Sequence, residues 1–159
     1  MSRVLTYLGR FALILIGYAI AALAASTFLH VVSLGPLGFT TKEMPAVIMG
    51  SIVFSIPFVA LFVGYFAFMP AAVTILLAEL LGARGWLYYA LGGAFVATVI
   101  VVWFVRAAEA SNDAVRDPRY WAAMVGGGIV GGLAYWLVAG RLAGNWWRSE
   151  PTSPAPSGS

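Results

Sequence analysis

The sequence predicts an all-α integral membrane protein, a bundle of four transmembrane helices with a short extra helix after the second span. Hydrophobic residues make up 62% of the 159 residues, and charged residues only 9%. An ordinary soluble domain is about a quarter charged. The charged residues are also bunched, so that long uncharged intervals lie between them. Both observations indicate a multi-pass membrane protein.

Composition also narrows the classes of function. The formal net charge is +3, but the nine basic residues are scattered, whereas nucleic-acid binding requires a basic cluster on one face. They flank the apolar intervals, which is typical of residues that contact lipid headgroups. The chain has no cysteine, which excludes disulfides, thiolate nucleophiles and cysteine-ligated metal centres. We expect a lipid bilayer as partner, no nucleic acid and no cofactor.

The first span is expected over residues 11–32. It follows Arg10, and its apolar run ends where Gly35 and Pro36 indicate a turn. This length suffices to cross a bilayer core about 30 Å thick. The run is longer than the apolar region of a cleavable signal peptide, about 7 to 15 residues, so we expect an uncleaved signal-anchor.

The second uncharged interval is ambiguous in length. Its 35 residues would form a helix of about 52 Å, too long for one crossing and too short for two crossings with a turn. We expect a span over residues 46–68 and a short helix over residues 70–82, opened by Pro70 and ended by Gly82. The short helix would be interfacial or re-entrant. The alternative is one continuous helix that is kinked at Pro70 and projects past the membrane.

The third and fourth spans are expected over residues 85–105 and 120–140. Each of these intervals has 21 uncharged residues, about 32 Å of helix, which is one crossing apiece. Asp117 and Pro118 are predicted to be the N-cap and the first-turn proline of the fourth span.

Domain organisation and orientation follow from these spans. Residues 1–148 form one transmembrane domain, and residues 149–159 form a Ser- and Pro-rich tail that cannot bury enough apolar surface to be ordered. With a cytoplasmic N-terminus, four spans place five basic residues inside and four outside, and this excess inside agrees with the positive-inside rule. Both termini are therefore expected in the cytoplasm. A five-span arrangement gives the same count, but no polar turn lies between Phe58 and Pro70.

Small residues indicate where the spans pack. Helices in lipid associate through close packing, so small residues at four-residue spacing mark contact faces. The predicted packing residues are Gly17, Ala21 and Ala25 in the first span and Gly127, Gly128, Gly131 and Gly132 in the fourth. Packing within one chain is the preferred interpretation, and a subunit interface is the alternative.

Glu79 is the acidic residue that bears most directly on function. It follows a long uncharged stretch and precedes Arg84, its expected partner, by five residues. An ionisable group at membrane depth is a functional hypothesis by default. The preferred interpretation is an ion pair at the headgroup boundary that orients the short helix, and the alternative is a proton or ion site.

His30 is the one histidine, and the chain has no cysteine. A zinc site needs three or four protein ligands, so we expect His30 to be a hydrogen-bonded or water-exposed side chain at the membrane interface.

The segment between the third and fourth spans carries mixed charge. A solvated connector is the simpler interpretation, but this loop is also the best candidate for docking a partner protein. Its charged residues are Arg106, Glu109, Asp113, Arg116, Asp117 and Arg119. The sequence has no P-loop, GxSxG, HExxH or GxGxxG motif, so we expect no enzymatic activity.

Two stretches of the chain carry a pattern that covers about half of its length. The first combines residues 68–71, Ala78 and Glu79, Arg84 and residues 87–93, and the second is residues 135–144. They resemble uncharacterised small inner-membrane proteins of alphaproteobacteria. The resemblance implies four spans and a bacterial inner membrane, and it implies no activity.

These observations together predict a non-enzymatic integral membrane protein, an accessory or assembly subunit of a membrane complex. Its contact with other membrane subunits, or with a second copy, would use the Gly-rich helix face and the loop of residues 106–119. The alternative is a small transporter or channel subunit with a polar site at Glu79 and Arg84. Few ionisable residues lie within the spans, which argues against a conduit formed by this chain alone.

Overall fold

The protein is all-helical in the ranges that its computed structural model describes, residues 2–34, 46–107 and 117–142. The helices are α1 (Ser2–Leu34), α2 (Ala46–Leu81), α3 (Trp86–Ala107), α5 (Pro118–Val138) and the short 3₁₀ helix η2 (Gly140–Leu142). The four α-helices are each long and apolar enough to cross a membrane. The predicted all-α fold with four membrane-crossing helices is confirmed. The predicted tail, residues 149–159, lies outside the described residues.

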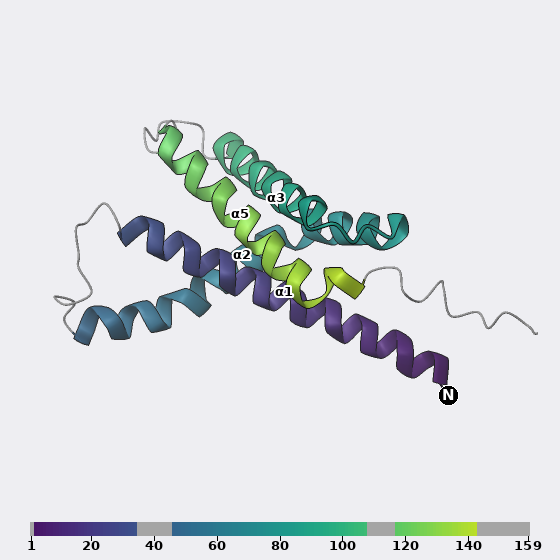
Figure 1. Cartoon of the computed structure of the whole chain (residues 1–159). Helices are drawn as coiled ribbons and strands as arrows, with labels where there is room; N and C mark the ends of the chain where they lie inside the picture. The colour runs from purple at the N-terminus through teal and green to yellow at the C-terminus, as the bar shows by residue number, and fades with distance from the viewer. Residues whose placement is uncertain (1, 35–45, 108–116, 143–159) are drawn as a thin grey trace, which may run out of the picture.

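Helix α5 is the centre of the bundle. Its contacts with α3 and α1 are the most extensive between helices, while α2 contacts α1 and, to a smaller extent, α3. In Figure 1, α5 runs alongside α3 and crosses α1, and α2 passes behind α1. The start of α1 and the end of α5 lie at the same end of the bundle (Figure 1), as an even number of crossings requires.

The short helix expected over residues 70–82 is instead the last part of α2. This helix continues from Ala46 to Leu81 with Pro57 and Pro70 in its interior, so the continuous alternative describes the chain. An interior proline removes one backbone hydrogen bond, whereas ending the helix in hydrocarbon would leave about four carbonyl groups without donors. The carbonyl that loses its donor is that of Phe66, four residues before Pro70, and the hydroxyl of Thr74 donates one turn further on, to the carbonyl oxygen of Pro70 at 2.9 Å.

The ends of two helices follow the local sequence signals. Gly82 ends α2 with a φ of 59°, and the amides of Gly82 and Ala83 donate back to the carbonyls of Glu79 and Ala78, the Schellman arrangement. At the start of α5, the carboxylate of Asp117 accepts a hydrogen bond from the Arg119 amide at 2.8 Å. The predicted glycine stop and aspartate N-cap are therefore confirmed.

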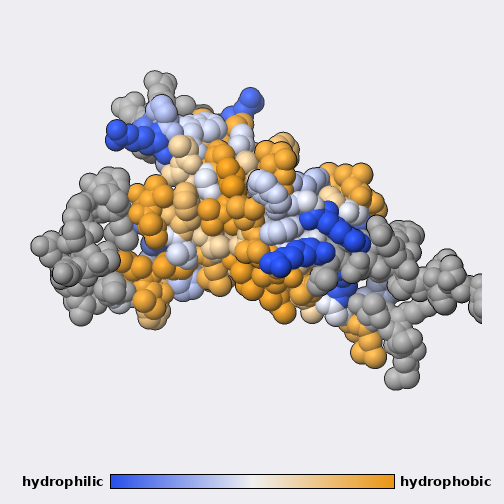
Figure 2. Space-filling model, viewed as in Figure 1, coloured by the Kyte–Doolittle hydropathy of each residue, from blue (hydrophilic) through white to orange (hydrophobic). Residues whose placement is uncertain are grey.

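The outer surface of the bundle is apolar. Large side chains of α2 are among the most exposed, with Phe54 at 84% and Tyr65 at 78%. On the face that it views, Figure 2 shows hydrophobic side chains across the middle and hydrophilic side chains towards the two ends. In water such a surface would be a liability for aggregation, but hydrocarbon is its natural surrounding. The protein is a multi-pass membrane protein.

Candidate functional site

One contact between α3 and α5 is made by backbone against backbone. A Cβ atom at Gly128 would overlap the carbonyl oxygen of Gly93, and one at Gly132 would overlap that of Tyr89. Any side chain at these two positions would force the helices apart. Gly128 and Gly132 therefore face α3 within the same chain.

The neighbouring glycines of α5 face α1. A Cβ atom at Gly131 would lie 3.1 Å from the carbonyl oxygen of Ala21 and 3.4 Å from the Cβ of Ala25, and one at Gly127 would touch Leu29. On α1, a Cβ atom at Gly17 would lie 3.0 Å from the Cβ of Ala139. All seven predicted packing residues thus lie at contacts between this chain's own helices. The Gly-rich face of α5 is therefore covered by α1 and α3.

Glu79 forms an ion pair with Arg10. Nη2 of Arg10 lies 2.6 Å from Oε1 of Glu79, and the two side chains are 21% and 17% exposed. The pair joins the start of α1 to the end of α2. Sequence reasoning named Arg84 as the partner and missed Arg10, because a separation of 69 residues leaves no local signal.

Arg84 lies at the same end of the bundle. Its backbone carbonyl accepts a hydrogen bond from Nε1 of Trp136 at 2.8 Å, and the hydroxyl of Tyr89 donates to the neighbouring carbonyl of Ala83 at 3.1 Å. These bonds fasten the turn between α2 and α3 to α3 and α5. The structure therefore brings both predicted polar residues to one end of the bundle, together with Arg10. We call this the basic end.

A stripe of polar side chains on α1 faces α2. The hydroxyl of Tyr18 donates to the carbonyl of Gly64, and the buried hydroxyl of Ser26 donates to that of Ile56 at 2.7 Å. Tyr18, Ser26 and His30 are separated by multiples of four residues, so they share one helical face. This spacing was visible in the sequence, and it is the signal that would have identified the α1–α2 contact.

His30 is hydrogen-bonded at both ring nitrogens. Nδ1 lies 2.8 Å from the carbonyl oxygen of Ser26, and Nε2 lies 2.8 Å from Oγ of Ser55. A backbone carbonyl can only accept, so Nδ1 donates to it. Nε2 is hydrogen-bonded to the Ser55 hydroxyl, which also lies 3.2 Å from the carbonyl oxygen of Ile52. The expectation of a satisfied histidine near the end of the first span agrees with this geometry.

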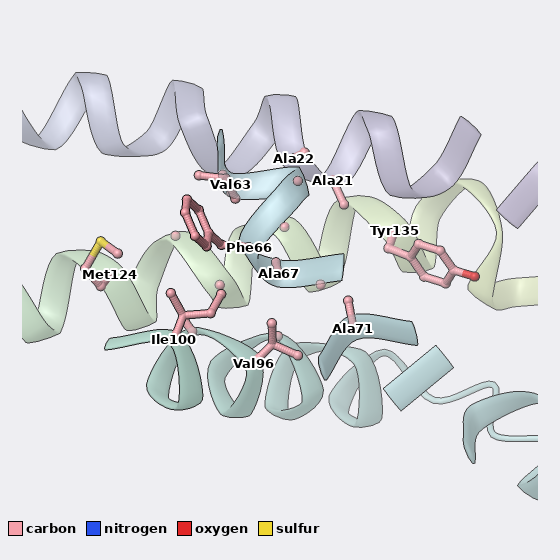
Figure 3. Close-up of a pocket in the computed structure, with 18 of the residues that line it drawn as sticks. Ala21, Ala22, Val63, Phe66, Ala67, Ala71, Val96, Ile100, Met124 and Tyr135 are labelled. Carbon is pink, nitrogen blue, oxygen red and sulfur yellow. The ribbon is translucent and has the colours of Figure 1, made fainter. Parts of the chain in front are cut away.

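Two of the hollows that the described residues form lie between the helices. The first, the central cavity, has a volume of about 320 Å³ and is lined by all four α-helices. Figure 3 shows its wall, with Phe66 and Ala67 of α2 facing Ile100 of α3 and Ala21 of α1. The second, the α2 groove, has a volume of about 1070 Å³ and is lined by α1, α2 and the last part of α3. Both have almost wholly apolar linings.

The charged loop is described only at its two ends. Arg106, Asp117 and Arg119 are exposed, and the Asp117 carboxylate caps α5. The candidate docking residues Glu109, Asp113 and Arg116 lie outside the described residues. Over residues 2–34, 46–107 and 117–142, no three His, Asp or Glu side chains come together in a way that could hold a metal ion.

Comparisons of the chain with protein-family models, with curated proteins and with solved structures return no match. The candidate site therefore depends on the geometry alone.

Proposed function

We propose that this protein is a non-enzymatic accessory or assembly subunit of a membrane complex, and that a transmembrane helix of its partner docks in the α2 groove. The observation that carries the proposal is the groove itself, a hollow of about 1070 Å³ on the helix with the least extensive packing within the chain. The glycine-rich face of α5 is covered by α1 and α3. The groove is the larger of the two apolar hollows described above.

The lining of the groove suits a helix. Small residues form part of it, among them Ala22 of α1 and Ala60 and Gly64 of α2. Small residues let the backbone of another helix approach closely, which is how helices associate in lipid. Phe68 and Trp103 also line the groove and offer ring surfaces for packing. The shape supports recognition of the helix-in-groove kind.

The location that accompanies this proposal is the bacterial inner membrane, with both termini in the cytoplasm. Support comes from the basic residues, of which five lie on the side of the N-terminus and four on the other side when the chain crosses four times. The start of α1 and the end of α5 at one end of the bundle agree with this (Figure 1).

Photo-crosslinking from matched positions tests the proposal. Leu61 lines the groove and is 73% exposed, and Leu80 on the same helix is 75% exposed but does not line it. A photoreactive residue at 61 should crosslink to one stoichiometric membrane protein, whereas the same residue at 80 should not. Leu61→Ala should also weaken co-purification of that protein in mild detergent, and Leu80→Ala should not. Equal crosslinking from both positions would refute docking in the groove, and crosslinking to a second copy would indicate self-association instead.

The Arg10–Glu79 pair favours a second candidate function, a transporter or channel subunit with a polar site at the basic end. Partly exposed ionisable groups near membrane depth mark ion and proton pathways in many membrane proteins, and α2 carries two interior prolines. Purified chain reconstituted in liposomes tests this candidate. Glu79→Gln should abolish a proton-linked flux while the fold stays intact, whereas loss of assembly alone would assign the pair a structural role.

A further inference from the structure

The central cavity is long and narrow. Its lining on α5 runs from Tyr120 to Tyr135, a rise of about 22 Å along the helix. Figure 3 shows Met124 towards one end and Tyr135 at the other, with Ala71 and Val96 between them. A volume of about 320 Å³ over such a length cannot hold a helix, which is about 10 to 12 Å wide. It has the shape of a single extended hydrocarbon chain.

The cavity lies next to the lipid-facing groove. Tyr18, Ala22 and Gly64 line both hollows, and the hydroxyl of Tyr18 donates to the carbonyl of Gly64 in the wall between them. The lining of the cavity is almost wholly apolar, so hydrocarbon is the matching chemistry.

One polar side chain stands at the basic end of this cavity. Tyr135 is 5% exposed, and its hydroxyl makes no hydrogen bond with any described residue. Figure 3 shows this hydroxyl pointing away from the middle of the cavity, and Tyr135 packs in one cluster with Ala78, the neighbour of Glu79. A phenol hydroxyl can donate a hydrogen bond, so a ligand oxygen that accepts one finds a donor here.

The charge of the basic end selects an anion. Its described charged side chains are Arg10, Arg84, Arg141 and Glu79, which sum to +2. Arg141 is exposed and lies over the ring of Trp136, with 5.0 Å between its Cζ and the ring centroid. Basic pockets between transmembrane helices bind anionic lipid headgroups.

We propose that the central cavity holds one acyl chain of an anionic phospholipid from the bilayer, with the headgroup at the basic end. In this arrangement the Tyr135 hydroxyl donates to an ester or phosphate oxygen, and the arginines balance the phosphate charge. The bound chain fills space between α2 and the other three helices. This inference goes beyond the proposed subunit function and does not require a protein partner.

Native mass spectrometry tests the proposal with the full chain in lipid nanodiscs of equimolar phosphatidylglycerol and phosphatidylcholine. The chain should retain one phosphatidylglycerol after the disc is removed, in preference to phosphatidylcholine. Arg141→Gln should lower this preference about fivefold, because one basic residue near a lipid surface contributes about 1 kcal/mol. Retention of both lipids in the mixing ratio would overturn the headgroup assignment.

A matched pair of substitutions tests the acyl chain. Ala71→Phe places a ring in the cavity, and Ala122→Phe makes the same change at an exposed position of α5. The first should abolish lipid retention, and the second should leave it unchanged. Retention by both variants, or a purified chain that carries no lipid, would overturn the proposal.

Tyr135→Phe keeps the test decisive if the ring at position 71 prevents folding. It removes only a hydroxyl that makes no hydrogen bond within the described residues, so the fold should persist. Retention of phosphatidylglycerol should fall about fivefold. Tyr65→Phe removes a hydroxyl at a 78% exposed position that lines the α2 groove and not the central cavity, so it should leave lipid retention unchanged. Equal retention by both variants would refute the role of Tyr135.

Discussion

Arg10 and Glu79, which are 69 residues apart in the chain, meet at 2.6 Å between Nη2 and Oε1. The contact ties the start of α1 to the end of α2 beside the turn that leads into α3. Both side chains are about four-fifths buried, so water screens the pair less than it would an exposed one. The pair has therefore a structural role even before any role in transport is considered.

Breaking this ion pair should destabilise the protein. Glu79→Gln should lower the free energy of unfolding by about 2 kcal/mol, because hydrogen bonds to charged groups contribute about 1.5 to 3 kcal/mol. Unfolding by denaturing detergent, followed by circular dichroism, measures the change. The double variant Arg10→Gln with Glu79→Gln should lose less than the sum of the single variants. Strict additivity would show that the two residues do not interact.

Adding a side chain at the backbone contact between α3 and α5 should destabilise the protein. Gly132→Ala places a Cβ atom on the carbonyl oxygen of Tyr89, and overpacking of this kind costs about 1 to 3 kcal/mol. Gly132→Leu should lose more and should alter mobility on native gels. Gly9→Ala is the control, since a Cβ atom there meets nothing within 4 Å. If thermal unfolding of the two alanine variants were the same, the close contact would not exist.

The C-terminal end of α2 should be destabilised by a side chain at position 82. Gly82 has a φ of 59°, and an L-residue held in this left-handed region costs about 1 to 2 kcal/mol. Gly82→Ala should therefore lower the thermal midpoint, whereas Gly85→Ala should not, because that position has open space and no left-handed backbone. Equal midpoints would argue against the Schellman end of this helix.

Removing the partner of His30 should weaken the contact between α1 and α2. Ser55→Ala leaves the Nε2 atom of His30 without the hydroxyl that lies 2.8 Å away, and the loss of one such hydrogen bond costs about 0.5 to 1.5 kcal/mol. Thr27→Ala is the control, since the Thr27 hydroxyl is exposed and bonds only within its own helix. Hydrogen exchange of the α1 amides near His30 should increase in the first variant alone.

The sequence alone carried enough information for the number of membrane crossings and for two helix ends. Uncharged length, the Asp117-Pro118 pair and Gly82 are properties of neighbouring residues, and they act in the same way wherever the helix packs. Small-residue spacing also identified the positions that lie at helix contacts. The spacing could not show that Gly127 and Gly131 contact α1 while Gly128 and Gly132 contact α3. Both pairs lie on the same helix and have the same four-residue spacing.

Only the tertiary structure decided which distant residues meet. The pairing of Glu79 with Arg10, the two hollows beside α2 and the isolated hydroxyl of Tyr135 depend on the angles at which the helices cross. Those angles follow from how the surfaces of different helices fit together, and hydrophobic periodicity within a single span does not encode them. The continuity of α2 through Pro70 was likewise decided by its surroundings, since in hydrocarbon a helix end leaves more backbone groups without partners than a proline does.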